Sequence, residues 1–168
     1  MDDDSSITSH AFDSARFRQV LGHFPTGVTV VTAGSSAEDR VGLAIGSFFS
    51  VSLEPPLVGF CAGCSSTSWP RVRAAGRFCV NILAADQEDL SRVFSSKAPD
   101  KFEGIGYKPA PFSGAPVLEG ALAWIDCDLD CVHEAGDHEV AIARVHDLQV
   151  GGVGGPLVFF RGGYGALQ

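Results

Sequence analysis

Three hydroxyl side chains stand together in the segment CSSTSWP, residues 64–70, where a helix is predicted to begin. The free backbone N–H groups of a helix start, together with the helix dipole, favour a bound anion. Ser65, Ser66 and Thr67 are therefore candidate ligands of a phosphate. The same residue types also cap helices without binding anything, and the pattern by itself favours capping.

His138 is a second candidate, in the turn GDH at residues 136–138 between two long predicted strands. Its ring should lie at the rim of the fold, a place that suits contact with a ligand. Gly and Asp also occur in such turns for backbone reasons, so the motif alone is weak. The stretch GSFFSVSLEPP, residues 46–56, adds small hydroxyl residues, but its pattern is also typical of an ordinary strand end.

The other reactive side chains form no recognisable metal centre or catalytic triad. The remaining histidines lack metal-motif spacing, and there is no GxSxG elbow. Five cysteines without secretory context argue against disulfides. Cys127 and Cys131 fall on one face of a predicted strand, with Asp126, Asp128 and Asp130 on the other. They would be about 13 Å apart, too far for one zinc, so we expect the cysteines to be small buried hydrophobes.

These residues must be positioned by about seven strands and three short helices. A first helix is expected after Asp13, with Phe17, Val20, Leu21 and Phe24 on one face, and Gly22 and Pro25 as its end. Two more are expected, from Thr67 to Ala75 and after a capping Asp86. Residues 97–120 should be an ordered irregular loop. Strands are expected at 28–33, 41–52, 57–62, 77–83, 121–133, 138–150 and 157–161.

The strands follow one another through tight turns, with no regular alternation with helices. We therefore expect a mainly β fold, an antiparallel sheet closed into a barrel. With 168 residues and 45% apolar content the chain can bury a core. We expect residues 1–12 to be a flexible N-terminal arm and residues 13–168 to be a single domain.

Charge and hydropathy exclude several partners. A net charge of −8 argues against nucleic acid, which needs a basic face. No apolar run approaches the roughly 18 residues of a membrane span, and the acidic start is unlike a signal peptide. We therefore expect a soluble, cytoplasmic protein without a membrane partner.

Several motifs stand in the order found in a known family. They are FPTGVTVVTA (24–33), GLAIGSFFSVSLEPPLV (42–58), the CSST helix start, GRFCVNIL (76–83), LSRVFSSKAPDKF (90–102) and GDH (136–138). Together they closely resemble the flavin reductase family, the small reductase components of two-component flavin-dependent monooxygenases. The resemblance covers roughly residues 14–164.

The resemblance implies a homodimeric split β-barrel of Greek-key type that binds FAD or FMN in a groove near the subunit interface. NADH, or alternatively NADPH, would stack against the flavin and reduce it. The reduced flavin would then pass to a partner monooxygenase, by transient contact or by diffusion. Hydride transfer between these cofactors needs no protein nucleophile, metal or acid, which agrees with the missing triad.

The family's functional positions map onto seventeen residues of this chain. The resemblance implies that the flavin ring lies along Thr26, Ala44, Ile45, Gly46, Ser47, Ser50, Val51 and Ser52. It implies that Ser65, Ser66 and Thr67 face the phosphate, and that Asn81, Phe94, Lys101 and Phe102 lie near the ribityl or phosphate side. His138 would contact the nicotinamide, and Tyr164 would be the aromatic that closes the site.

Two positions depart from the family pattern. Ala44 and Gly46 stand where the family commonly has hydroxyl residues. Backbone groups can serve a flavin ring there, and a glycine permits close approach. Two other functions stay open: a barrel that holds flavin without turnover, and a flavoprotein that acts on a substrate of its own.

Overall fold

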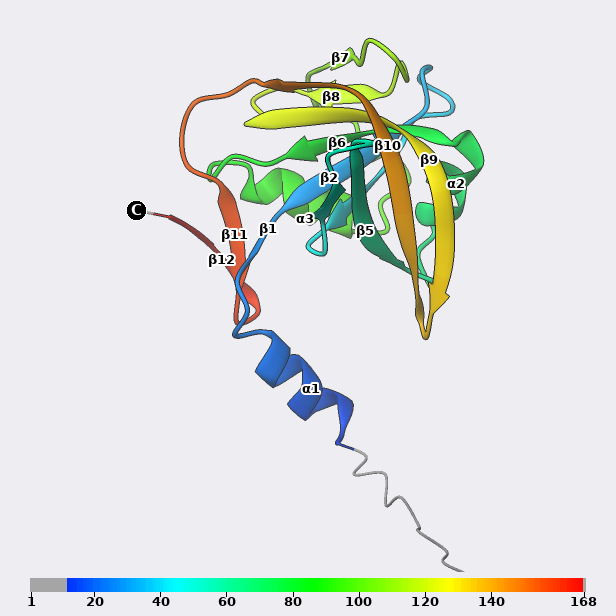
Figure 1. Ribbon diagram of the computed structural model, residues 1–168. Helices are drawn as coiled ribbons and strands as arrows, with labels where there is room; N and C mark the ends of the chain where they lie inside the picture. The colour runs from blue at the N-terminus through cyan, green and yellow to red at the C-terminus, as the bar shows by residue number, and fades with distance from the viewer. Residues whose placement is uncertain (1–11, 168) are drawn as a thin grey trace, which may run out of the picture.

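The structure is a computed structural model that describes residues 12–167, so the expected arm lies almost wholly outside the described residues. Seven strands form one antiparallel sheet in the order β3-β2-β6-β9-β10-β5-β4 (Figure 1). Its members are β2 (Thr29–Ala33), β3 (Val41–Ile45), β4 (Phe49–Ser52), β5 (Leu57–Gly63), β6 (Arg77–Ile82), β9 (Ala123–Ala135) and β10 (His138–Val150). The predicted antiparallel, mainly β architecture is confirmed.

Two small sheets and three helices surround this sheet. The strands are β1 (Thr26–Gly27), β11 (Leu157–Phe160) and β12 (Gly163–Ala166) in one sheet, and β7 (Tyr107–Pro109) and β8 (Pro116–Leu118) in the other. The helices are α1 (Ser14–Leu21), α2 (Trp69–Ala75) and α3 (Glu88–Ser95). The prediction of an irregular loop over 97–120 is therefore wrong in part, because β7 and β8 form a hairpin within it.

The expected single strand over residues 41–52 is two strands on opposite edges of the sheet. β3 pairs with β2, and β4 pairs with β5, so the chain crosses from one edge to the other between Ile45 and Phe49. In this crossing the Ser47 hydroxyl accepts a hydrogen bond from the Cys61 N–H at 2.9 Å and donates one to the Cys61 carbonyl at 3.0 Å. A side chain thus links β5 to the crossing.

Aromatic side chains fill the barrel. Phe60 packs edge to face against both Trp69 and Phe78, with ring centroids 5.5 and 5.7 Å apart. A second cluster packs under α3, where Phe94 meets Phe102 at 5.0 Å. A Cβ on Gly42 would lie 2.5 Å from the Phe94 ring, so the absence of a side chain lets α3 approach β3.

The helix ends confirm some expected caps and correct another. Asp13 accepts a hydrogen bond from the Arg16 N–H at 2.7 Å, and α1 begins at Ser14 as predicted. Gly76, at φ +69°, ends α2. Asp86 does not cap α3, because Gln87 holds the N-cap position. The Gln87 side chain accepts a hydrogen bond from the Ala84 N–H and donates one to the Glu119 carbonyl.

Asp126 lies in the core, although its alternation with the cysteines predicted an outward face. The side chain is wholly buried and accepts hydrogen bonds from the backbone N–H groups of Phe112 (2.7 Å) and Ser113 (3.1 Å). Residues 97–120 cover this half of β9, so both of its faces are buried there. Two backbone donors compensate the carboxylate for the loss of water.

The expectation that the cysteines are buried holds for Cys79 and Cys127 only. All five are free; Cys64 is exposed, and Cys61 and Cys131 are partly buried. Burial, with the nearby Asp126 carboxylate, raises the pKa of Cys127 to about 12 and raises that of Cys79 as well. The two buried thiols are therefore inert.

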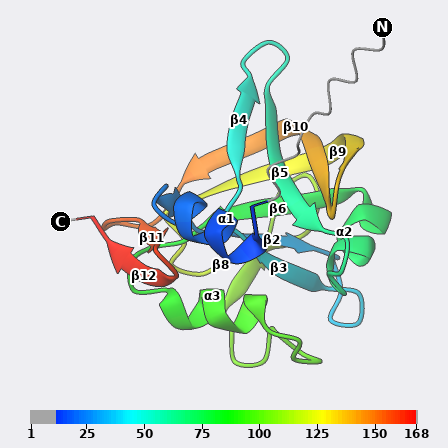
Figure 2. The same cartoon turned by 90° about the horizontal axis from the view of Figure 1, so that it is seen from below.

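Helix α1 projects away from the barrel (Figure 1), and its predicted apolar face is uncovered. Phe17, Val20 and Leu21 are 50%, 59% and 53% exposed. Seen from below, the β4–β5 hairpin also extends beyond the barrel (Figure 2), and Leu53 near its tip is 91% exposed. None of the helices within residues 12–167 has the length and hydrophobicity needed to cross a membrane.

Candidate functional site

A groove of about 450 Å³ opens where the crossing after β3, the end of β5, the start of α2, the end of α3 and the β9–β10 turn meet. Segments nearly 100 residues apart in the chain, such as the crossing and the turn, come together here. Ten of the predicted site residues line the groove: Ala44, Ile45, Gly46, Ser47, Ser65, Ser66, Thr67, Phe94, Lys101 and His138.

Residues 43–47, from β3 and the crossing, line the groove. β3 is an edge strand, so one row of its N–H and C=O groups has no strand partner. Gly46 adds no side chain, and a Cβ built there would lie 3.4 Å from the Thr26 hydroxyl. Thr26 does not line the groove itself, but it places a hydroxyl directly beside Gly46.

The hydroxyl segment before α2 divides into two roles. Ser66 accepts hydrogen bonds from the N–H groups of Trp69 (3.1 Å) and Ser68 (3.3 Å) and so holds the turn that leads into α2. The N-cap of α2 is Ser68, which makes no capping hydrogen bond with its side chain. Ser65 and Thr67 are exposed in the groove. The predicted phosphate contact therefore fits Ser65 and Thr67 better, and it stays a prediction.

Lys101 brings a positive charge to the same groove. Its ammonium donates to the carbonyls of Phe94 (2.9 Å) and Gly42 (3.2 Å) and to the Ser68 hydroxyl (3.2 Å). These bonds use all three N–H donors, so Lys101 acts on a ligand through its field. Partial burial lowers its pKa. Lys97 also lines the groove.

His138 lies at the rim, as its place in the turn predicted, and its side chain is 49% exposed. Its Nδ1 is 2.7 Å from a carboxylate oxygen of Asp137, and this bond lowers the pKa of Asp137. With Nδ1–H donated to Asp137, Nε2 is the free ring nitrogen. A Cβ on Gly63 would lie 3.7 Å from Nε2, so Gly63 leaves this side of the ring open.

Several predicted site residues lie outside the groove. Ser50, Val51 and Ser52 lie on β4 and are not among its lining residues. Phe102 is 4% exposed and packs under α3. Tyr164 makes a hydrogen bond of 2.9 Å to Ser91. None of these five residues lines the groove that contains His138.

Asn81 is the predicted site residue whose placement differs most from expectation. It is wholly buried; its amide group donates to the Val30 and Pro116 carbonyls, and its oxygen accepts from the Leu118 N–H at 2.8 Å. Asn81 thus links β2, β6 and β8 and has no surface left to contact a flavin. We assign it to the core.

Seven groove residues were not among the predicted ones: Leu43, Cys61, Gly63, Ser68, Ser95, Ser96 and Lys97. Ser95, Ser96 and Lys97 fall within the motif LSRVFSSKAPDKF, so a signal for them existed. Cys61 and Gly63 had none, because only the sheet topology decides which side of β5 faces the groove.

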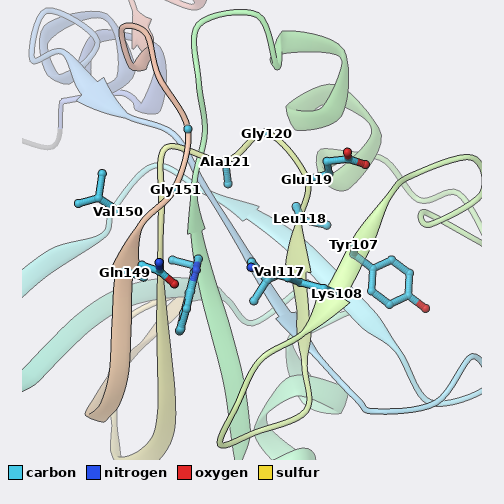
Figure 3. A pocket seen from close by; sticks show the side chains of 12 residues that line it. Tyr107, Lys108, Val117, Leu118, Glu119, Gly120, Ala121, Gln149, Val150 and Gly151 are labelled. Atoms are coloured by element: carbon cyan, nitrogen blue, oxygen red, sulfur yellow. The ribbon is translucent and has the colours of Figure 1, made fainter.

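A larger hollow of about 630 Å³ lies elsewhere, between the β7–β8 hairpin and the far ends of β9 and β10 (Figure 3). Lys108, Glu119, Trp124 and Gln149 are among its lining residues. It contains no predicted site residue. Size alone does not locate chemistry, so the smaller groove is the candidate site.

The chain resembles known proteins along nearly its whole length. A family model described as "Flavin reductase like domain" matches residues 21–168. A flavin reductase of Pseudomonas putida is 50% identical over 97% of this chain and 95% of its own length. The reductase subunit of a flavin-dependent monooxygenase from Rhodococcus jostii is 46% identical, covering 98% of this chain and 84% of that protein.

Solved structures share the fold. A homologue of nitrilotriacetate monooxygenase component B from Mycobacterium thermoresistibile has a TM-score of 0.87 and 45% identity, over 92% of this chain and 86% of that one. An NADH:FAD oxidoreductase from Streptomyces globisporus, solved with NAD and FAD fragments, has a TM-score of 0.87 and 35% identity, with 93% of each chain covered.

These matches confirm the resemblance that the ordered motifs indicated. The family model spans residues 21–168, and the relatives extend over most of their own lengths. The structural neighbours confirm the split-barrel fold. The chain is therefore an oxidoreductase that belongs to the flavin reductase family.

Proposed function

We propose that this protein transfers a hydride from NADH to FAD or FMN in the groove and then releases the reduced flavin to a partner monooxygenase. The observation that carries the proposal is the groove itself, which brings His138, the edge of β3 and the exposed hydroxyls of Ser65 and Thr67 to one surface. The similarity to reductase subunits of monooxygenases supports the same function.

The redox chemistry belongs to the two cofactors, since hydride passes from the nicotinamide C4 to the flavin N5. The chain's task is to bind and orient them. The open backbone edge of β3 offers N–H donors to the polar edge of the flavin ring. Ser65 and Thr67, with the field of Lys101, would hold the phosphate, and Nε2 of His138 would orient the nicotinamide.

The residues present fit a flavin despite the two departures from the family pattern. Gly46 lacks the usual hydroxyl, but the Thr26 hydroxyl lies beside it and remains available at this part of the surface. At Ala44 the backbone of an edge strand remains. A planar ring can approach such a surface closely because no large side chain stands in its way.

We further propose that the protein works as a homodimer. Both the apolar face of α1 and the β4–β5 hairpin project from the barrel with uncovered apolar side chains, Leu21 and Leu53 among them. Contiguous exposed apolar surface on a folded protein marks an interaction site. A second copy would cover it.

Steady-state oxidation of NADH, followed by absorbance, tests the proposed activity. Purified protein is assayed with FAD, FMN or no added flavin, and then with NADPH. We expect a rate that saturates with added flavin. A protein that is inert with both flavins and both nucleotides would contradict the proposal. A protein that is permanently yellow and does not oxidise NADH would favour flavin binding without turnover. A rate that depends on a further organic substrate would favour a flavoprotein that acts on a substrate of its own.

A further inference from the structure

The large hollow between the β7–β8 hairpin and the far ends of β9 and β10 is separate from the groove (Figure 3). The two share no lining residue within residues 12–167. The hollow's volume of about 630 Å³ is in the range of small-molecule sites, roughly 300–1,000 Å³. Volume alone does not indicate a ligand, but the polar groups that line this hollow do.

Trp124 on β9 lines the hollow and is 6% exposed, yet its indole N–H has no acceptor in residues 12–167. The indole of Trp69, by contrast, donates to Glu139. In the part of the chain that the structure describes, the wholly buried side-chain nitrogens and oxygens are all paired except Nε of Arg40. The unpaired Nε1 of Trp124 is therefore not sealed in the core. Since a buried indole N–H normally has a partner, this one can donate to a molecule in the hollow.

Two further polar side chains stand on opposite walls of the hollow, Lys108 on β7 and Gln149 on β10 (Figure 3). Both are exposed, and neither side chain forms an ion pair or a hydrogen bond with another described residue. The carboxylate of Glu119, which also lines the hollow, lies against Gly106. An indole and an ammonium only donate hydrogen bonds, and an amide can do so too. The uncommitted groups therefore suit an anionic acceptor.

The rest of the lining is largely apolar. Val117 and Leu118 on β8 are buried, while Val150 on β10 is 80% exposed at the hollow. The Trp124 ring adds a wide apolar surface, and aromatic rings pack favourably against one another and against such side chains. A flat hydrocarbon ring suits this lining better than a fully polar ligand does.

We propose that the large hollow is a second ligand site, which binds a small aromatic carboxylate. The carboxylate accepts the Trp124 indole N–H and pairs with the Lys108 ammonium, and the Gln149 amide donates to it from the opposite wall. The ring packs against Trp124 and Val150. This inference is independent of the proposed reduction of flavin, because the two sites share no described lining residue.

Benzoate titration, followed by nitrogen–proton correlation NMR of isotope-labelled protein, tests the site without any measurement of activity. The chain has two tryptophans and so gives two indole N–H signals. The signal that disappears in Trp124→Phe belongs to Trp124. We expect benzoate to shift this signal saturably and to leave the Trp69 signal in place, because that N–H is already bonded to Glu139. A Trp124 signal that does not move would leave the N–H to water and overturn the inference.

Replacing Lys108 tests the ionic contact. We expect Lys108→Gln to raise the dissociation constant of benzoate about fivefold, the worth of one exposed charge pair. Lys108 is exposed and unpaired among the described residues, so the substitution should leave the fold intact. The matched control is Arg144→Gln, which removes a positive charge from β10 outside the hollow and should leave the affinity unchanged. Equal weakening in both variants would reduce the effect to overall charge and overturn the contact.

Two further probes separate the two halves of the ligand. Acetate has the carboxylate without the ring, and benzyl alcohol has the ring without the charge. Each should bind at least about tenfold more weakly than benzoate, and equal binding of acetate would overturn the aromatic class. Excess FMN should not displace benzoate. Displacement by FMN would assign benzoate to the groove of His138 and overturn the inference, without bearing on whether flavin is reduced there.

Discussion

His138 and Ser66 differ in how many of their polar atoms are already hydrogen-bonded within the protein. The His138 ring is held by one hydrogen bond to Asp137 at an exposed turn, so its free nitrogen can contact a ligand. The Ser66 oxygen already accepts two backbone N–H groups before α2. We therefore assign the proposed ligand contacts mainly to the less committed side chains, His138, Ser65 and Thr67.

Replacing His138 should affect the nicotinamide and not the flavin. We expect His138→Ala to raise the KM for NADH about tenfold, the worth of one good hydrogen bond, with flavin dissociation constants within about twofold of the wild type. Steady-state kinetics and fluorescence titration measure the two. Equal loss of NADH use and flavin binding would show that His138 supports the whole groove.

The two roles in the hydroxyl segment can be separated by single substitutions. Thr67→Ala should raise the dissociation constant of FMN about fivefold, since one hydrogen bond to phosphate is lost, and leave the free energy of unfolding unchanged. Ser66→Ala should lower the free energy of unfolding by about 1 kcal/mol because two backbone N–H groups at the start of α2 lose their acceptor. Unchanged FMN affinity in Thr67→Ala would leave the segment with a structural role alone.

Sequence alone could locate His138 and the hydroxyl segment, because turn and helix-start signals are local. It could not place Asn81, since an amide in a family motif looks the same whether it binds a ligand or links three strands. Only the tertiary contacts with Val30, Pro116 and Leu118 show that this amide is fully used.

At the scale of elements, the crossing from β3 to β4 creates the site. A continuous strand over 41–52 would have kept the backbone beside β2, whereas the break moves β4 to the opposite edge. The alternation of apolar residues did not reveal this break, because Gly46 and Ser47 interrupt it only briefly. In the same way, the alternation on β9 could not show that residues 97–120 cover Asp126.

The buried carboxylate of Asp126 anchors that covering segment to β9. Asp126→Ala should lower the free energy of unfolding by about 3 kcal/mol, because two backbone N–H groups lose their acceptor in the core. Asp126→Asn keeps one acceptor oxygen and should cost less. Urea denaturation measures both; equal stability of Asp126→Ala and the wild type would contradict the anchoring role.

The uncovered face of α1 belongs to the proposed dimer. Val20→Glu combined with Leu21→Glu should convert the dimer to a monomer, because two charges would enter an apolar interface. Gln19→Glu adds a charge to the opposite side of α1 and is the matched control. Light scattering after size-exclusion chromatography gives the mass; a monomeric wild type would contradict the assignment of this face.

At the scale of the whole molecule, a small antiparallel barrel gathers side chains from distant parts of the chain into one groove. The general class of fold follows from strand and turn patterns, and the composition allows a sizeable core. The groove's location does not follow from them, because it depends on which strands lie at the edges of the sheet. The ordered motifs supply that missing information through the family.

The central claim is that flavin is reduced and then leaves the protein. Anaerobic mixing of NADH with a small amount of protein and a large molar excess of FAD, followed by flavin absorbance, tests it most directly, because without oxygen each flavin can be reduced only once. The account predicts that all of the added flavin is reduced. Reduction that stops at one equivalent per protein would contradict it and would identify a flavoprotein that keeps its cofactor.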